Sequence, residues 1–433
     1  MTSDANAAID AIWRIESPKL IARLVRMMHD VGLAEELAQD ALVIALEKWP
    51  ESGVPDNPGA WLMATAKNRA IDRLRRDARL DQKYEQVANE LAAAQANAWP
   101  TVGMADDEIG DDLLRLIFIA CHPVLSTEAR VALTLRLLGG LTTDEIARAF
   151  LVPESTVAQR IVRAKRTLAE ANVPFEVPTG DELTARLSSV LEVIYLVFNE
   201  GYSATAGDDW MRPALCDDAL RLGRVLAELT PREPEVHGLV ALMEIQASRA
   251  RARTDPSGAP VLLLDQDRSR WDHVLIRRGL EALQRAEALG GALEPYALQA
   301  AIAACHARAR NPEDTDWGRI AALYDALAQL MPSPVVDLNR AVAVGMAFGP
   351  TAGLEVVDAL VDEGSLAEYH LLPSVRGDLL AKLERYDEAA AEFARAASLT
   401  RNARERELML QRAADCSVSA SVVCARRPRR WSQ

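Results

Sequence analysis

Residues 141–168 read LTTDEIARAFLVPESTVAQRIVRAKRTL and predict two helices joined by a tight turn. Thr142 and Glu145 have the spacing of a capping box, so we expect the first helix to begin there. It is expected to end before Pro153, because a proline pushes the residue before it out of the helical region. The second helix has apolar residues three and four positions apart, which predicts one buried stripe. These residues are Val157, Ile161, Ala164 and Leu168.

The opposite face of the second predicted helix is basic. No acidic residue occurs between positions 155 and 168, and the polar side chains of this face are Gln159, Arg160, Arg163, Lys165 and Arg166. A short helix, a turn and a basic amphipathic helix form a helix-turn-helix, whose second helix can enter a major groove. The same pattern also suits a helical hairpin that only packs, so the rest of the chain must decide between the two interpretations.

The composition predicts a helical protein of more than one domain. The chain has 433 residues, of which 49% are hydrophobic and 5% aromatic, and this length favours two or three domains. The net charge of −14 argues against a protein that binds DNA unaided, because nonspecific affinity depends on neutralising phosphates. Basic residues are nevertheless concentrated between Lys67 and Arg79. We therefore expect local basic helices on an acidic body that reaches DNA while held by a larger partner.

No targeting segment or cofactor signature is evident. The sequence has no run of about 18 uncharged apolar residues that would predict a membrane span, and its N-terminus does not resemble a secretory signal. The Cys121-His122 and Cys305-His306 pairs suggest metal ligands, but without further ligands at useful spacing core packing is the favoured interpretation. We expect reduced thiols in a cytoplasmic protein without metal or cofactor. The five cysteines are Cys121, Cys216, Cys305, Cys416 and Cys424.

Residues 8–49 predict two or three helices. Ile12, Ile15, Leu20, Leu24 and Val25 suit one buried stripe. A later helix, residues 33–49, has an apolar face that includes Leu37, Ala41, Ile44 and Ala45 and a polar face with Glu36, Gln39, Asp40 and Glu47. Such an acidic face is commonly just solvated. A loop rich in Gly, Pro and Asp is expected at residues 50–57.

The next predicted helix displays an aromatic ring, an amide and several guanidinium groups together. Asn57 is the expected N-cap and Pro58 lies in the first turn. One face carries Trp61, Thr65, Asn68 and Asp72, flanked by Arg69, Arg73 and Arg76. Aromatic rings stack on unpaired bases and arginines hold the backbone, which suits single-stranded DNA. The alternative is that Trp61 packs on the preceding helix and the arginines are solvated.

Residues 81–111 read as a linker with some helix, and helices are expected at 112–120 and 126–138. The stretches LAEELAQDALVIALEKWP and NPGAWLMATAKNRAIDRLRR resemble region 2 of sigma-70-type transcription initiation factors. LSTEARVALTLRLLGGLTTDEIARAFLVPESTVAQRIVRAKRTL resembles their region 4. The two motifs agree in order and spacing over about residues 8–170. The gap between them is too short for a third domain, as in the compact extracytoplasmic-function group.

This resemblance implies roles for particular residues of region 2. Glu36, Gln39 and Asp40 match the surface that docks on the clamp helices of the RNA polymerase largest subunit. The loop at 50–59 corresponds to the one that captures a flipped base of the −10 element. The helix that melts and holds this element matches Trp61, Asn68, Arg69, Asp72, Arg73 and Arg76.

The resemblance also implies roles in region 4, which in the family docks on the polymerase flap and binds the −35 element. The matching residues are Ser155, Thr156, Ala158, Gln159, Arg160, Val162, Arg163 and Lys165. Ala158, Gln159, Val162 and Arg163 align with positions that face base edges, and Arg160 and Lys165 would hold phosphates. Ala158 departs from the family, where a polar side chain is common. Specificity should therefore depend on Gln159 and Arg163, whose chemistry suits adenine and guanine respectively.

The C-terminal half is helical in pattern from about residue 181 to 414, after a hinge at 173–180. Residues 377–399 resemble a tetratricopeptide unit. Tyr324, Val357 and Phe393 are 33 and 36 residues apart by subtraction, near the 34-residue period of such repeats. Helix-pair repeats stack into surfaces used for protein contacts. The tail after Asp415 lacks a helical pattern, and we expect it to be irregular.

Two motifs of the C-terminal half each follow an apolar run. The first contains Asn199, Glu200 and Tyr202, and the second contains Asp265, Asp267, Arg268 and Arg270. They predict either a ligand, interaction or enzyme site, or an ion-pair and capping network between repeats. Both resemble motifs of a sigma subgroup with a tetratricopeptide-like extension, which implies regulation in cis rather than catalysis.

Together these observations predict an all-α alternative sigma factor, not an enzyme, whose partners are core RNA polymerase and promoter DNA. The extension would add intramolecular or regulatory protein contacts. The expected domains are region 2 at 1–80, a linker at 81–111, region 4 at 112–172, the repeat-like extension at 180–415 and a tail at 416–433. One alternative is a helix-turn-helix regulator that binds duplex DNA without acting as a sigma factor. Another is an enzyme that uses Glu200, Asp265 and Asp267.

Overall fold

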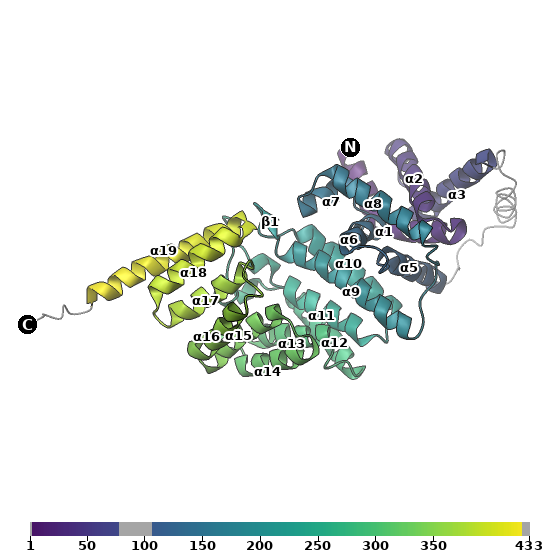
Figure 1. Ribbon diagram of the computed structural model, residues 1–433. Helices are drawn as coiled ribbons and strands as arrows, with labels where there is room; N and C mark the ends of the chain where they lie inside the picture. The colour runs from purple at the N-terminus through teal and green to yellow at the C-terminus, as the bar shows by residue number, and fades with distance from the viewer. Residues whose placement is uncertain (1, 78–105, 427–433) are drawn as a thin grey trace, which may run out of the picture. The chain divides into compact units, whose positions relative to one another are not determined.

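The computed structural model describes residues 2–77 and 106–426 (Figure 1). The described chain is almost entirely α-helical, which confirms the predicted fold class. It divides into two compact units, an N-terminal unit (Met1–Leu196) and a C-terminal unit (Val197–Gln433). Every helix among the described residues is too short or too polar to span a bilayer.

The N-terminal unit begins with three helices that pack on one another. They are α1 (Thr2–Met28), α2 (Val31–Ser52) and α3 (Pro58–Asp77). The side chain of Asp30 caps α2 by accepting a hydrogen bond from the backbone N–H of Leu33. Asn57 caps α3 in the same way, through the N–H of Ala60 at 2.9 Å, as the sequence predicted.

Two local expectations for these helices are wrong. The α2 helix continues past Pro50 to Ser52 and ends at Gly53, whose φ of 82° is available to a residue without a side chain. Pro50 has no backbone N–H to donate to the preceding turn, and the helix ends shortly after it. Ile15, expected in the buried stripe of α1, is 57% exposed.

The rest of the N-terminal unit is built from α5 (Asp106–Ala120), α6 (Thr127–Leu137), α7 (Thr143–Phe150), α8 (Glu154–Glu170) and the first part of α9 (Asp181–Tyr202). The α5 helix begins at Asp106 and not at Asp112 as expected, because acidic residues in a first turn favour helix. Much of the expected linker lies at 78–105, outside the described residues.

The helix-turn-helix forms as predicted. Thr142 and Glu145 make a complete capping box at the start of α7. Leu151 ends α7 in the left-handed region at φ 51°, and Pro153 stands immediately before α8. The four residues of the predicted apolar stripe of α8 are all buried, with at most 4% of each exposed. The stripe packs against α6 and α7, and much of the opposite face of α8 is exposed.

The C-terminal unit is a succession of helices in which each packs on its neighbours in the sequence. After the end of α9 and a short strand β1 (Ala206–Gly207) come the following elements: α10 (Pro213–Leu229), α11 (Pro234–Ala247), the 3-10 turns η1 (Ala250–Ala252), η2 (Leu263–Asp265) and η3 (Arg268–Arg270), α12 (His273–Ala288), α13 (Pro295–Arg308), η4 (Pro312–Asp314), α14 (Trp317–Leu330), α15 (Pro334–Phe348), α16 (Pro350–Glu363), α17 (Leu371–Lys382), α18 (Tyr386–Leu399), β2 (Arg401–Asn402) and α19 (Ala403–Arg426). The β1 and β2 strands pair in parallel, with Ala206 opposite Arg401.

The predicted tetratricopeptide-like unit at 377–399 falls on α17 and α18, which pack on each other, as α13 packs on α14 and α15 on α16 (Figure 1). The three residues that mark the sequence period, Tyr324, Val357 and Phe393, fall on the second helix of each of these pairs. Small residues lie where helices meet: a Cβ added to Gly353 would come within 2.8 Å of the Cα atom of Gly345. These features agree with the repeat pattern in the sequence.

The expectation of an irregular tail after Asp415 is wrong up to Arg426, where α19 ends. Cys416 is 8% exposed and belongs to the apolar core around Phe393, so packing holds this part of the helix. The hydroxyl groups of Ser417 and Ser419 donate hydrogen bonds to the carbonyl oxygens four residues earlier in the same helix. Residues 427–433 lie outside the described part.

Candidate nucleic-acid interface

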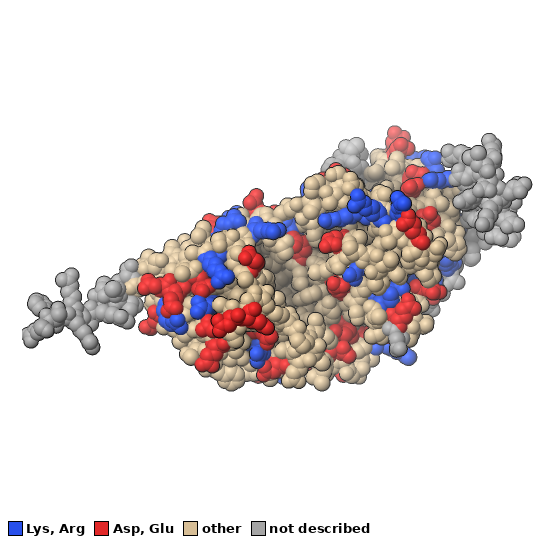
Figure 2. Space-filling view, in the orientation of Figure 1, with Lys and Arg blue, Asp and Glu red and all other residues tan. Residues whose placement is uncertain are grey.

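The exposed face of α8 carries the residues predicted to contact duplex DNA. Ser155, Gln159, Val162 and Arg163 are exposed, with Val162 at 64%. Thr156, Ala158, Arg160 and Lys165 are half-buried beside them. Figure 2 shows a row of basic side chains over this helix. The arrangement has the shape and charge that a recognition helix needs in a major groove.

Lys165 is engaged in an ion pair that the sequence analysis did not anticipate. Its ammonium group contacts the carboxylate of Glu35 on α2, and the guanidinium of Arg136 on α6 donates to the same carboxylate at 2.6 Å. Glu35 is only 4% exposed. Burial raises its pKa, but Lys165 and Arg136 outweigh burial and hold the pKa below the ordinary value. A residue expected to hold a phosphate therefore joins α8 to α2 in this structure.

Two further ion pairs join the first helices to the region 4-like helices. Arg14 contacts Glu145 at 2.9 Å, and Arg26 contacts the buried Asp112 at 3.2 Å. Their partners are far apart in sequence, and nothing in the local pattern pairs them. Only the folded structure, which brings these side chains together, reveals the two ion pairs.

The predicted polymerase-docking residues lie on the solvent side of α2. Glu36 and Asp40 are exposed, whereas Gln39 is half-buried and donates to Glu35 at 2.8 Å. Glu36 also forms an ion pair with Arg73 of α3 at 2.7 Å. A residue expected to face polymerase and one expected to face DNA are therefore in direct contact.

The predicted −10 face of α3 is largely exposed. Asn68, Arg69, Asp72 and Arg73 are exposed. Trp61 is half-buried and packs edge-to-face on Trp49 of α2, with ring centroids 5.2 Å apart. This contact agrees with the packing interpretation of Trp61 and leaves part of its ring accessible. The side chain of Arg76 lies outside the described residues.

The first C-terminal motif is tied down by ion pairing and stacking. Glu200 is only 8% exposed. Its carboxylate pairs with Arg212 and accepts a hydrogen bond from the hydroxyl of Thr205 at 2.9 Å. The Arg253 guanidinium carbon lies 3.5 Å from the ring centroid of Tyr202 and also donates to the Tyr202 carbonyl. Asn199 is half-buried on the same helix end.

The second motif serves mainly to hold a turn. Asp267 accepts hydrogen bonds from the backbone N–H and hydroxyl of Ser269, at 3.0 and 2.6 Å. Arg268 donates to the carbonyl oxygens of His306 and Ala309 at the end of α13. Asp265 is exposed, and the structure gives it no side-chain partner among the described residues. These contacts agree with the ion-pair and capping interpretation of both motifs.

No described group of three or more Asp, Glu, His and Cys side chains is arranged to hold a metal ion. Four of the cysteines are free, buried thiols: Cys121, Cys216, Cys305 and Cys416. Cys121 contacts the hydroxyl of Thr134 at 3.3 Å, and burial raises the pKa of this thiol to about 11. His306 packs edge-to-face on Trp317.

Comparisons with known proteins follow the same division of the chain. Residues 12–80 match the model of Sigma-70 region 2, residues 115–168 that of Sigma-70, region 4, and residues 186–287 a family of unknown function (DUF6596). A Rhizobium meliloti (strain 1021) protein described as uncharacterized is 44% identical over 402 residues, which cover 90% of this chain and 91% of the relative. The ECF RNA polymerase sigma factor SigK of Mycobacterium bovis (strain BCG / Pasteur 1173P2) is 31% identical over 169 residues, 37% of this chain and 84% of the relative. SigK of Mycobacterium ulcerans (strain Agy99) is 32% identical over 149 residues, 34% of this chain and 75% of the relative.

The chain belongs to the sigma-70 family, in its extracytoplasmic-function group. The matched region 2 contains α2 and α3, and the matched region 4 contains α6, α7 and α8. The SigK relatives account for the sigma regions alone, whereas the Rhizobium relative extends over the C-terminal unit as well. Both C-terminal motifs of this sigma factor lie within the segment that matches the family of unknown function.

Proposed function

We propose that this sigma factor binds core RNA polymerase through α2, reads the −35 element with α8 and holds a melted −10 element on α3. The observation that carries the proposal is the pairing of two sigma regions in one unit with their predicted contact faces exposed. On α8, Gln159 and Arg163 supply the chemistry that suits adenine and guanine edges. Ala158 beside them offers only a methyl group, which fits an apolar contact.

Core polymerase supplies the affinity that the acidic chain cannot provide for itself. A net charge of −14 opposes unaided binding to a polyanion. In the proposed complex the acidic Glu36 and Asp40 contact basic groups of the polymerase clamp. Docking of Glu36 requires its pair with Arg73 to open, and this costs little because both side chains are about half exposed.

The C-terminal unit is proposed to modulate this activity through protein contacts. Its support is the separate compact unit and the repeat-like helical pairs, whose stacked surfaces suit protein partners in other repeat proteins. Among the acidic groups of its two motifs, Glu200 is engaged by Arg212 and Thr205, and Asp267 by Ser269. They are therefore better suited to holding the fold than to acid–base chemistry.

Promoter-specific run-off transcription tests the proposal. Purified core polymerase is incubated with and without the protein on promoter regions upstream of genes adjacent to its own. Transcripts that begin at a fixed distance from shared −35 and −10 elements are expected only with the protein. Failure to bind core polymerase would sink the proposal and favour the alternative, a regulator that binds duplex DNA alone.

A further inference from the structure

A stretch of the C-terminal unit concentrates arginine around one pocket. Between residues 249 and 272 the chain carries Arg249, Arg251, Arg253, Arg268 and Arg270. Within the described residues none of these guanidinium groups forms an ion pair with a carboxylate. Arg268 instead donates to backbone carbonyls, and Arg253 donates to the carbonyl of Tyr202. With five arginines and four aspartates, the stretch keeps a net charge of +1 (5 − 4).

Three of the five arginines are held in place by aromatic rings. Arg253 lies over Tyr202 and, at 5.3 Å, over Trp210. Arg249 lies 5.9 Å from the Tyr202 ring and 6.0 Å from that of Trp271, and Arg268 lies 4.7 Å from Trp271. Cation–π contacts of this kind fix the position of a guanidinium without cancelling its charge. Arg249, which lies over both Tyr202 and Trp271, thereby connects the first motif with the second.

Three of the four aspartates of this stretch hold turns and caps, and the fourth, Asp265, is exposed. Asp255 accepts hydrogen bonds from the backbone N–H groups of Ser257 and Ala259. Asp267 holds Ser269, and Asp272 caps α12 through the N–H groups of Val274 and Leu275. Asp267 is also near enough to Arg270 for that arginine to help lower the pKa of the carboxyl, after the larger effect of Ser269. The carboxylates shape the pocket, and the net excess of charge remains positive.

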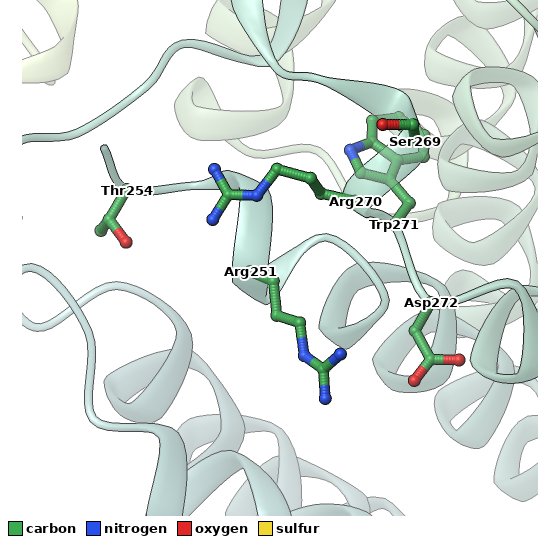
Figure 3. A pocket seen from close by; sticks show the side chains of 6 residues that line it. All are labelled: Arg251, Thr254, Ser269, Arg270, Trp271 and Asp272. Carbon is green, nitrogen blue, oxygen red and sulfur yellow. The ribbon is translucent and has the colours of Figure 1, made fainter. Parts of the chain in front are cut away.

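The other two arginines line the pocket itself. It is an open cavity of about 720 Å³ bordered by Arg251, Thr254, Ser269, Arg270, Trp271 and Asp272 (Figure 3). In Figure 3 the Arg270 side chain extends toward Thr254, and that of Arg251 extends toward the side of Asp272. Both arginines are exposed. The volume is within the range of small-molecule sites.

One neutral hydroxyl, that of Thr254, adds a hydrogen-bond donor at the same place. No side-chain hydrogen bond involves the Thr254 hydroxyl among the described residues, whereas the Ser269 hydroxyl already donates to Asp267. Trp271 is only 4% exposed, and its buried indole N–H has no partner in the described structure. Trp271 therefore contributes a wall of the pocket, and its N–H is enclosed in the same way as those of Trp49 and Trp210.

From this geometry we propose that the pocket of Arg251, Thr254, Arg270 and Trp271 binds a small phosphorylated molecule. Guanidinium groups and hydroxyls are the common donors to phosphate oxygens, and arginine can donate two parallel hydrogen bonds. A phosphate monoester carries nearly two negative charges at neutral pH, which two arginines match. The site would give the C-terminal unit a ligand whose binding orders the stretch that links its two motifs.

Binding is tested on the full chain without polymerase or promoter, so the outcome is independent of the proposed sigma function. Isothermal titration at fixed ionic strength uses pyrophosphate and glucose 6-phosphate as probes and succinate as a non-phosphate dianion. The Arg251→Gln/Arg270→Gln double variant should lose at least about tenfold in affinity for the phosphate probes. The matched control is Arg277→Gln/Arg310→Gln, which removes the same charge from two exposed arginines outside the pocket and should bind as the wild type does.

Hydrogen exchange locates the site on the chain. The phosphate probe should slow amide exchange in residues 249–272 of the wild type and not in the pocket variant. The proposal is overturned if neither phosphate probe binds saturably up to about 10 mM, if succinate binds equally well, or if both double variants lose affinity alike. Stronger binding of random duplex DNA than of either probe at these arginines would also overturn it, in favour of a nucleic-acid surface.

Discussion

Arg163 and Arg166 are both exposed on α8, but their surroundings differ. Arg166 pairs with Glu170 at 2.6 Å near the end of the helix, whereas Arg163 lies beside Gln159 on the proposed base-reading face. The Arg163→Ala variant should weaken binding of the −35 element by about 1–3 kcal/mol. Run-off transcription that depends on this element should then fall roughly 5- to 150-fold. Transcript yield at constant core polymerase concentration measures this loss.

The Arg166→Ala variant is the matched control for this prediction. It removes the same charge from the same helix and should leave promoter preference unchanged. Wild-type transcript levels with Arg163→Ala would contradict the assignment of this face of α8. An equal loss with both variants would show that only net charge matters.

His306 gives the C-terminal unit a dependence on pH. It is 8% exposed, and burial, with Arg249 and Arg268 nearby, lowers its pKa to about 4. The unfolded chain takes up this proton near pH 6.5, but the folded chain only near pH 4. This contribution to stability is therefore complete above about pH 6.5 and falls as the pH drops toward 4, by up to about 3 kcal/mol.

Replacing His306 by Gln should remove that slope, as measured by thermal unfolding of the C-terminal unit between about pH 7 and 4. The comparison must be made with the wild type, because Glu235 acts in the opposite direction: burial raises its pKa to about 7. The control is His237→Gln, which removes a half-buried histidine elsewhere in the unit. An unchanged slope in the His306 variant would show that the pKa of this residue is the same in the folded and the unfolded chain.

Helices with a local start signal were predictable from sequence, and contacts between helices were not. The capping box of Thr142 and Glu145 and the N-cap Asn57 involve residues three positions apart, so their spacing is visible in the chain. Glu35 is separated from Arg136 by 101 residues. Its neighbour Glu36 has the same side chain, and only packing makes one buried and the other exposed.

This difference between Glu35 and Glu36 predicts unequal effects of the same substitution. Glu35→Gln leaves Lys165 and Arg136 facing a neutral amide, with only 20% and 18% of their side chains exposed, and should destabilise the N-terminal unit by about 3 kcal/mol. Glu36→Gln breaks an exposed pair and should cost less than about 1 kcal/mol. Because the pKa of Glu35 is lowered in the folded chain, its contribution is present at neutral pH and is lost as the pH falls through that lowered value.

Hydrogen exchange in α2, α6 and α8 measures these effects without requiring two-state unfolding of the whole chain. Faster exchange in all three helices of the Glu35 variant, with little change in the Glu36 variant, is the expected result. Equal exchange in the two variants would mean that the Glu35 contacts do not hold these helices together in solution.

At the scale of the whole molecule, the sequence predicted two sigma regions and a helical extension that follows a hinge. The hinge at 173–180 contains the proline and glycine residues that usually mark a boundary. The first part of α9, up to Leu196, nevertheless belongs to the N-terminal unit. Arg186 donates to the carbonyl of Phe118 and Ser189 to that of Cys121, contacts that no local pattern reveals.

Truncation at two positions tests whether the N-terminal unit ends at the hinge or within α9. A chain ending at Leu196 keeps the contacts of Arg186 and Ser189 with α5 and its C-terminal turn, whereas one ending at Ala171 loses them. At about 1 kcal/mol for each lost hydrogen bond, with the lost packing in addition, the shorter chain should melt about 5–10 °C lower. Equal melting temperatures would place the boundary at the hinge instead.

The chain ending at Leu196 should bind core polymerase yet differ from the full chain in transcript yield, because it lacks the C-terminal unit. Equal yields would remove the modulatory role proposed for that unit.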